Sequence, residues 1–345
     1  MLIEKMNDSK YYKHHPFNQN LYSGRDEPFE SDRACYWHEL MRAYDKQKIG
    51  LVGFACDQGV RRNQGRVGAK DAPDVIRGAF GKLPCSVALL DTFGTDRQGE
   101  LATLIGDMGN VECLDNQQVA ENTLEETQQA YADKITDILN QGGLAIGIGG
   151  GHSIAYASFL GLYQSLTDSE KTNKTIGVVN FDAHLDIRQS DLATSGTPFR
   201  QIAAHLQSEN RPFHYLCVGV SEYSNTAALF DRAKMLGVQM IMDNDCYRQP
   251  FEQIAQTLSD FTQQVDMLYL TIDMDCFAAG IVPGVSATAA KGLTLDFVER
   301  CIESLMASGK VKVADLAEIN PSFDIDGISS KVAARLLADI SSQYL

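Results

Sequence analysis

The segment VVNFDAHLDI, at 178–187, joins a run of apolar, strand-forming residues to three polar side chains that can bind a metal ion. Asp182, His184 and Asp186 stand at every second position after that run. Alternate side chains of an extended chain point the same way, so we expect these three to converge. A lone acidic residue at a strand end more often caps a helix or pairs with a cation. A metal site therefore requires further ligands.

Such ligands follow three other apolar runs. They are His152 in GIGGGHS (147–153), Asp273 and Asp275 in TIDMDCF (271–277), and Glu318 in LAEINPSFD (316–324). Ligands in open α/β sheets bind beyond the carboxyl ends of the strands, so these side chains are predicted to meet there. Cys276 is expected to face away from this site, into the core.

The predicted cluster combines four aspartates with two histidines, and its carboxylates would repel one another unless cations neutralised them. Oxygen and nitrogen ligands without cysteine favour Mn²⁺ over Zn²⁺. Two such ions about 3.5–4 Å apart bridge a water and lower its pKa, which makes a hydroxide nucleophile. The sequence therefore predicts a binuclear hydrolytic centre.

The elements that must position these residues are predicted from hydrophobic patterning. Continuous apolar runs indicate strands covered on both faces, at 51–56, 86–90, 144–149, 175–181, 213–220, 238–242, 267–273 and 313–319. Helical segments fall between many of them, at 71–81, 119–140, 153–166, 196–208, 225–236, 250–264 and 294–308. This alternation predicts an α/β fold with a mainly parallel eight-stranded sheet and helices on both faces.

The first 48 residues differ from the rest of the chain in polarity and periodicity. Residues 1–48 are polar and weakly periodic, and we interpret them as an N-terminal extension with one helix near 31–47. Residues 49–345 contain no internal repeat or linker and are expected to form a single catalytic domain.

Composition excludes several classes of partner. The chain has 345 residues, with 45 acidic and 30 basic residues and a formal net charge of −15, which disfavours binding to nucleic acid or anionic membranes. The eight cysteines are scattered without a CxxC pair, which indicates reduced thiols. No stretch approaches about 18 apolar residues, so we predict a soluble, cytoplasmic protein.

Five motifs resemble those of the ureohydrolases, the family of arginase and agmatinase, over roughly residues 50–340. They are GGGHS, NFDAHLDIR, SGTPF (195–199), TIDMDCF and AEINP. The resemblance implies an arginase-like, three-layer α/β/α sandwich and two Mn²⁺ ions per chain. It implies one ion bound by His152, Asp182, Asp186 and Asp273, and a second bound by Asp182, His184, Asp273 and Asp275.

Within this family the chain is most similar to the formimidoylglutamase branch, through segments at 55–77, 194–202 and 217–230. That similarity implies hydrolysis of N-formimidoyl-L-glutamate, a small-molecule substrate, to L-glutamate and formamide in histidine degradation. Phe199 stands where arginase has a proton-shuttle histidine, which argues against arginase but not against agmatinase. Agmatinase, or another amidinohydrolase of a guanidino acid, is the alternative, and the acidic net charge favours such a cationic substrate.

The chemistry of this reaction suggests roles for the remaining residues. Glu318 is expected to bind the cationic amidinium, and Asp275 to pass a proton to the leaving nitrogen. Arg188 is expected to bind a substrate carboxylate. Ser195 and Thr197 either contact the substrate or hold a turn.

Some questions stay open at this level. The loop arginines could either bind a second carboxylate or anchor their loop to the acidic body; they are Arg61, Arg62 and Arg66. A metal-binding protein without turnover is disfavoured by the intact Glu318 and Asp275, and a deacetylase-like hydrolase by the ligand set for two ions. Arginase relatives assemble as rings, so a homo-oligomer is compatible with the sequence.

Overall fold

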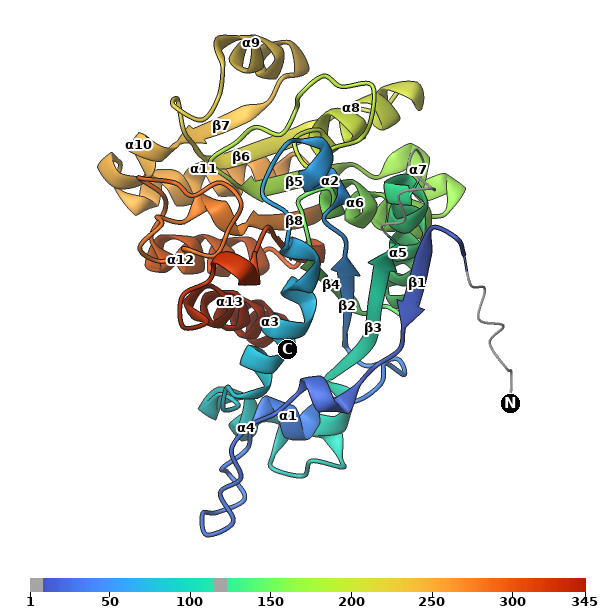
Figure 1. Ribbon diagram of the computed structural model, residues 1–345, viewed down its shortest axis with the longest axis vertical. Coiled ribbons are helices and arrows are strands. Elements are labelled where there is room, and N and C mark those ends of the chain that lie inside the picture. Colours follow the sequence, from blue (N-terminus) through green and yellow to red (C-terminus); the bar gives the residue numbers. More distant parts are fainter. Residues whose placement is uncertain (1–8, 115–122) are drawn as a thin grey trace.

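A central sheet organises the computed structural model, which describes residues 9–114 and 123–345. Within these ranges nine strands run in the order β1-β3-β2-β4-β9-β8-β5-β6-β7 (Figure 1). The strands are β1 Tyr12–His15, β2 Ile49–Ala55, β3 Ile105–Cys113, β4 Leu144–Gly149, β5 Ile176–Phe181, β6 His214–Val220, β7 Gln239–Met242, β8 Met267–Asp273 and β9 Val311–Ala317. β1 is antiparallel to β3, and all the other pairs are parallel.

Helices cover both faces of this sheet. One layer contains α3 Ala72–Gly81, α11 Phe251–Gln263, α12 Leu295–Met306 and α13 Ile328–Tyr344. The other contains α5 Thr123–Asn140, α6 Ile154–Ser165, α8 Pro198–Ser208 and α9 Ala227–Leu236. Each layer encloses its own hydrophobic core against the sheet, so the predicted three-layer α/β/α arrangement is confirmed.

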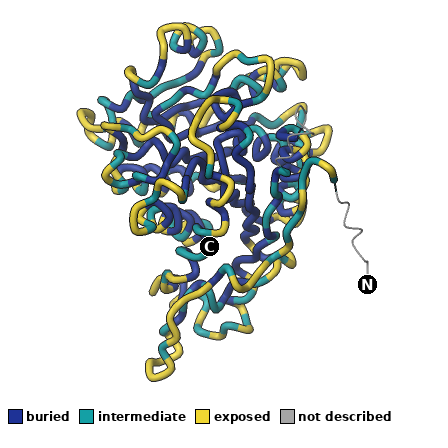
Figure 2. The backbone as a smooth tube through the Cα atoms, in the orientation of Figure 1, coloured by how far each residue is buried: buried dark blue, intermediate teal, exposed yellow. Residues whose placement is uncertain are grey.

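The central strands are buried along their whole length. Every residue of β2, β4 and β5 is buried, and Figure 2 shows the buried backbone concentrated in the middle of the molecule. A strand covered on both faces cannot alternate apolar and polar side chains, which explains the continuous apolar runs in the sequence.

Seven of the eight predicted strands are present, but the prediction at 86–90 is wrong. That segment belongs to a helix, α4 Val87–Phe93, because the Ser86 side chain accepts a hydrogen bond from the Leu89 N–H and caps the first turn. A short apolar run fits either structure, and here the cap decides between them. The extra strands are β1 and β3, so the sheet has nine strands rather than eight.

The N-terminal region also differs from the prediction. Instead of a helix spanning 31–47, the structure has a single four-residue helix, α1 Trp37–Leu40. β1 pairs with the outer side of β3, with Tyr12 opposite Cys113 and His15 opposite Asn110. Part of the predicted extension is thus hydrogen-bonded into the sheet. The predicted helix at 119–140 begins outside the described residues and is otherwise present as α5.

The smaller helices are α2 Gln58–Arg62, α7 Asp168–Asn173 and α10 Asp243–Arg248. Within the described ranges, none of the helices has the length and apolar character that crossing a bilayer demands. All eight cysteines are free thiols, and seven of them are buried.

Candidate metal centre and active site

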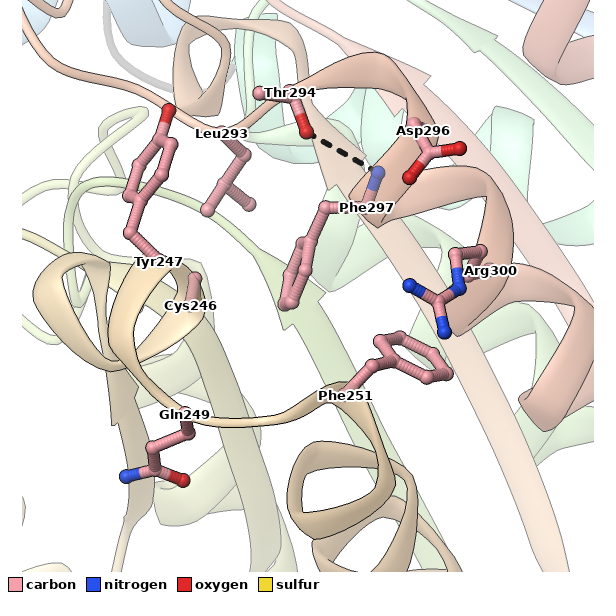
Figure 3. Close-up of a pocket in the computed structure, with 9 residues that line it drawn as sticks. All are labelled: Cys246, Tyr247, Gln249, Phe251, Leu293, Thr294, Asp296, Phe297 and Arg300. Atoms are coloured by element: carbon pink, nitrogen blue, oxygen red, sulfur yellow. Dashed lines mark hydrogen bonds between the residues drawn. The ribbon is translucent and has the colours of Figure 1, made fainter.

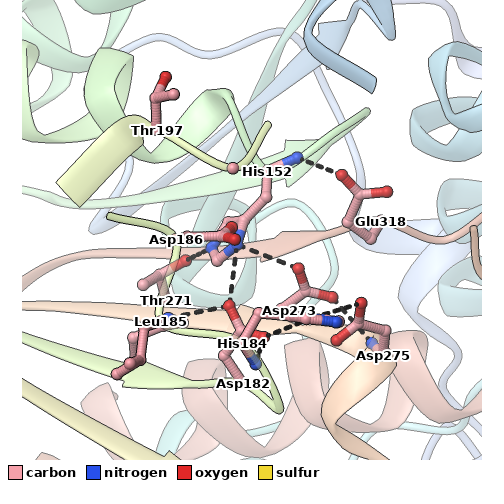
Figure 4. A network of polar contacts seen from close by, with 12 residues as sticks. His152, Asp182, His184, Leu185, Asp186, Thr197, Thr271, Asp273, Asp275 and Glu318 are labelled. Atoms are coloured by element: carbon pink, nitrogen blue, oxygen red, sulfur yellow. Dashed lines mark hydrogen bonds and ion pairs between the residues drawn. The ribbon is translucent and has the colours of Figure 1, made fainter. Parts of the chain in front are cut away.

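The predicted site residues come from four strands that are neighbours in the sheet, in the order β4-β9-β8-β5. Each residue lies at or just beyond the carboxyl end of its strand. His152 follows β4, Glu318 follows β9, Asp273 ends β8 with Asp275 two residues on, and Asp182, His184 and Asp186 follow β5. Parallel strands bring these ends to one edge, so residues 166 positions apart in the chain become neighbours (Figure 4).

The first cluster surrounds the ring nitrogen Nδ1 of His152. This atom lies 3.0 Å from Asp186 Oδ2, 3.0 Å from Asp273 Oδ2 and 3.3 Å from Asp182 Oδ2. One ligand atom from each of the four residues lies within 4.8 Å of the others, a spacing that could hold a metal ion. The His152 and Asp182 side chains are completely buried.

The second cluster surrounds His184, whose Nδ1 lies 3.3 Å from Asp182 Oδ1 and 3.2 Å from Asp275 Oδ2. Asp182 therefore directs one carboxylate oxygen to each cluster, as a ligand shared between two ions would do. Asp273, which the family resemblance assigns to both ions, groups only with the first cluster in this geometry.

Turns, rather than an extended chain, bring these side chains together. β5 ends at Phe181, and the Asp182 Oδ1 atom then accepts a hydrogen bond of 2.6 Å from the His184 N–H. Asp186 has a left-handed backbone with φ +46°, which is uncommon for residues other than glycine. Asp273 likewise accepts from the Asp275 N–H, at 2.8 Å. The expectation of an extended segment was wrong, although the three side chains do converge.

Buried negative charge dominates the electrostatics of the site. Burial, followed by the neighbouring Asp275 and Asp182, raises the pKa of Asp273 well above its usual range. The pKa of Asp275 is raised to about 6, chiefly by burial. Asp275 in turn raises the pKa of His184. For Asp273 and Asp275 burial is the largest cause of the raised pKa, and the neighbouring carboxylates of this crowded site add to it.

The donor set fits divalent cations. Carboxylate oxygens and imidazole nitrogens are ligands of Mn²⁺ and related ions, and the described residues place no cysteine among them. The buried Oδ1 atom of Asp275 has no hydrogen-bond partner within the described chain. A buried carboxylate oxygen without a partner is costly, and a bound cation would satisfy it.

Glu318 lies beside the clusters but belongs to neither. Its Oε1 atom accepts a hydrogen bond of 2.7 Å from the His152 backbone N–H, and its own backbone is left-handed, with φ +68°. Burial raises the pKa of Glu318 to about 8, with Asp273 adding to the effect. Strained, buried acids of this kind gather at functional sites.

A cleft of about 370 Å³ opens above the clusters. Its lining includes His184, Asp186, Asp273, Asp275 and Glu318 from the site, with Arg188, Ser195, Asn63, Arg66 and Ser286 around them. The candidate metal ligands and the cleft thus form one continuous site.

Arg188 lines this cleft and is exposed. Its backbone N–H donates to the Gly196 carbonyl at 2.8 Å, so the SGTPF segment holds it in place. Within the described ranges, its guanidinium makes no hydrogen bond or ion pair. A positive side chain of this kind remains available to an anionic ligand.

Residues of the SGTPF segment fall into two groups. Ser195 is buried and lines the cleft. The Thr197 hydroxyl accepts from the Thr194 N–H at 2.9 Å and is outside the cleft lining, which favours the turn-holding role for this residue. Phe199 is fully buried and packs edge-on against the His152 ring, with 5.4 Å between the centroids. It forms an apolar wall beside His152 and, unlike a histidine, has no proton to transfer.

The loop arginines have structural partners. Arg62 pairs with Glu125 at 2.7 Å and donates to the Ala193 carbonyl at 3.0 Å. Arg66 donates to the carbonyls of Ser286 and Val285, and its guanidinium lies 3.9 Å from the centre of the Phe323 ring. These contacts favour the anchoring role for both side chains.

A second pocket lies between α10 and α12, away from all the predicted site residues (Figure 3). Phe251, Phe297 and Leu293 contribute to its wall, and the Arg300 guanidinium stacks 3.7 Å from the centre of the Phe251 ring. It contains no group of metal ligands, so it does not compete with the cleft as the active site.

Two residues near the site were missed by the sequence reasoning. The Thr271 hydroxyl lies 3.1 Å from His152 Nε2, and the fully buried Asp315 accepts a hydrogen bond from that hydroxyl. A signal was present for Asp315, since a charged residue inside a continuous apolar strand must have partners.

The chain is also similar to known proteins in its sequence. The sequence matches the profile of the arginase family over residues 47–342. It is 57% identical over 341 residues to the formimidoylglutamase of Psychrobacter cryohalolentis, covering 95% of this chain and 97% of that one.

The fold is similar to two solved structures. The formimidoylglutamase of Bacillus subtilis superimposes with a TM-score of 0.75 at 22% identity, covering 92% of this chain and 95% of that one. The formiminoglutamase of Trypanosoma cruzi with Mn²⁺₂ gives a TM-score of 0.73 at 22% identity, covering 88% and 96%.

Proposed function

This chain belongs to the arginase family, and we propose on that basis that it hydrolyses N-formimidoyl-L-glutamate to L-glutamate and formamide, a step of histidine degradation. The observation that carries the proposal is the 57% identity to the Psychrobacter cryohalolentis formimidoylglutamase across nearly the whole of both chains. The cleft supports it, because the substrate is cationic at its amidinium and anionic at its two carboxylates. Acidic side chains and Arg188 line the same cleft.

We propose that two Mn²⁺ ions load the two clusters. Their donor atoms fit such ions, and the Trypanosoma cruzi relative is described with Mn²⁺₂. The ligands would be His152, Asp182, Asp186 and Asp273 for one ion, and Asp182, His184, Asp275 and the nearby Asp273 for the other. When bound, such ions supply a water nucleophile that is active near neutral pH and positive charge for the developing oxyanion.

The side chains of this protein would orient the substrate and move protons. Glu318 lies at the cleft with a carboxylate that is not needed as a ligand, so it can bind the amidinium. Asp275 can pass a proton to the leaving nitrogen of glutamate. Arg188 can form a paired hydrogen bond with a substrate carboxylate in the cleft that Ser195 also lines, while Thr197 keeps the turn in shape.

A panel of substrates tests the reaction on protein stripped of metal and reloaded with Mn²⁺. Formimidoyl-glutamate, agmatine, arginine and guanidinobutyrate are compared by kcat/KM. A clear preference for formimidoyl-glutamate is expected, because agmatine has no carboxylate for Arg188. Preference for agmatine or a guanidino acid would keep the site but replace the substrate.

Arg188→Ala is expected to lower kcat/KM for formimidoyl-glutamate about 10- to 100-fold, mainly through KM. This corresponds to losing about 1.5–3 kcal/mol from a hydrogen bond between charged groups. The matched control is Arg300→Ala, which removes the same charge at the second pocket and should leave kcat/KM unchanged. An Arg188→Ala enzyme with an unaltered KM would show that the carboxylate binds elsewhere.

Asp275→Asn is expected to lower kcat about 10²- to 10⁴-fold, because the amide cannot transfer the proton. Metal content per chain is measured on the same preparation. A slow enzyme with full metal content supports the proton-transfer role, and near-normal turnover would remove that assignment. If metal is lost, the variant reports on ligation instead.

We propose further that residues 49–345 act as one catalytic domain and that the enzyme works in the cytoplasm. One continuous parallel sheet from β2 to β9 supports the first point, with residues 1–48 as an extension that reaches the sheet through β1. The eight free thiols are typical of a reducing compartment and support the second.

A further inference from the structure

A short chain of hydrogen bonds leads away from the first cluster into the core of the sheet. It begins at His152 Nε2, on the far side of the ring from the three carboxylates, and reaches the Thr271 hydroxyl at 3.1 Å (Figure 4). That hydroxyl donates to Asp315 Oδ1 at 2.6 Å. All three side chains are fully buried. The mechanism described above assigns no task to Thr271 or Asp315.

The direction of these bonds determines which nitrogen of the His152 ring carries hydrogen. Asp315 accepts from three hydroxyl groups, those of Ser158, Tyr269 and Thr271, at 2.5–2.6 Å. The single hydroxyl hydrogen of Thr271 is therefore used on Asp315, and only a lone pair faces His152. Nε2 must then donate, which leaves the lone pair of Nδ1 directed at the carboxylate cluster as a metal ligand requires.

The register of the sheet fixes this arrangement. Asp315 on β9 lies directly beside Thr271 on β8 and beside Gly147 on β4. A Cβ atom at Gly147 would lie 2.8 Å from the Cβ of Asp315 and 2.2 Å from the Tyr131 hydroxyl oxygen. Glycine at this position of the GIGGGHS segment thus leaves room for the buried carboxylate. Three neighbouring strands therefore hold the hydrogen-bonded side chains of Thr271 and Asp315 in place behind His152.

We infer that Thr271 and Asp315 are positioning residues, which fix the orientation and tautomer of His152 and so set the metal affinity of the first cluster. Outer partners of metal-binding histidines commonly have this effect. Among the described residues, no hydrogen bond joins His184 to Thr271 or Asp315, so the second cluster should depend on them much less. The inference rests on the proposed metal loading but is independent of the substrate.

The test is a calorimetric titration of Mn²⁺ into metal-free protein. Thr271→Val keeps the shape of the side chain and removes the hydroxyl. It should weaken one of the two binding events about 10- to 100-fold and leave the other close to that of the unsubstituted protein. Thr271→Ser restores a hydroxyl at the same position and should recover most of the lost affinity.

Ser158→Ala is the matched control. It also removes a hydroxyl donor from Asp315, at the other carboxylate oxygen, and it leaves the bond between Thr271 and His152 in place. Its Mn²⁺ affinities should remain close to those of the unsubstituted protein. Equal weakening by Ser158→Ala and Thr271→Val would overturn the inference, because the loss would then reflect the packing around Asp315 alone. Unaltered affinities in Thr271→Val would overturn it too.

A second measurement needs no substitution at Thr271, and it decides the matter if Thr271→Val does not fold. Zinc-loaded protein with ¹⁵N-labelled histidine reports which ring nitrogen carries hydrogen, and a His152→Asn sample identifies the His152 signals. Hydrogen on Nε2 is expected, and hydrogen on Nδ1 would contradict the inference. Failure of the metal proposal would look different, since the unsubstituted protein itself would then bind no Mn²⁺.

Discussion

Asp182→Asn is expected to weaken Mn²⁺ binding at both clusters and to lower kcat/KM by about 10³-fold or more. Asp182 directs Oδ2 towards His152 and Oδ1 towards His184, so one substitution removes a charged ligand from each cluster. Two catalytic metal ions contribute several kcal/mol of charge stabilisation, and every 1.36 kcal/mol corresponds to a tenfold change in rate. Asparagine keeps the size of the side chain and the carbonyl oxygen that accepts from the His184 N–H.

Metal content per chain and kcat/KM for formimidoyl-glutamate are measured together on this variant. Asp243→Asn serves as the control, because it neutralises another buried aspartate that belongs to neither cluster. It should keep full metal content and normal turnover. An Asp182→Asn enzyme that kept two ions would show that Asp182 is not shared between them.

Glu318→Gln is expected to lower kcat/KM about 10²- to 10³-fold while the metal content stays unchanged. The glutamine keeps an oxygen that can accept from the His152 N–H, but it removes the carboxyl group, whose ionised form a bound amidinium would favour. Losing one such charge-stabilising contact in a buried site typically has an effect of this size. The loss should therefore come without unfolding or loss of ligands.

The control for this substitution is Glu125→Gln. It makes the same chemical change at a carboxylate that pairs with Arg62 and lies outside the cleft lining. Steady-state kinetics and metal analysis are compared for the two variants. Normal kcat/KM in Glu318→Gln would exclude a role for this carboxylate in binding the amidinium.

The positions of the candidate ligands could be predicted because of where they stand in the chain. Polar residues directly after buried parallel strands lie at the sheet's carboxyl edge, so the sequence alone predicts that His152, Asp182 and Asp273 lie together, as the structure has them. Their detailed geometry was not accessible, since the left-handed backbone of Asp186 depends on the surrounding turns. Nothing local in the sequence indicates that conformation.

The errors in the fold have specific physical causes. The strand β3 contains Asp107 and Asn110, which obscure its apolar pattern, yet both accept hydrogen bonds from the buried Arg77. This pairing is a long-range contact that no short window of sequence reveals. The role of Arg66 stayed open in the sequence for the same reason, because its partners at Val285 and Ser286 lie about 220 positions away.

The antiparallel strand β1 has a consequence for how the molecule behaves in a crowded solution. A sheet edge offers unpaired N–H and C=O groups to any passing chain, and such edges can template aggregation. Here β1 shields part of β3, from Asn110 to Cys113, and the opposite edge strand β7 has only four residues. Both edge strands, β1 and β7, are therefore only four residues long, so each offers another chain a short stretch of backbone to pair with.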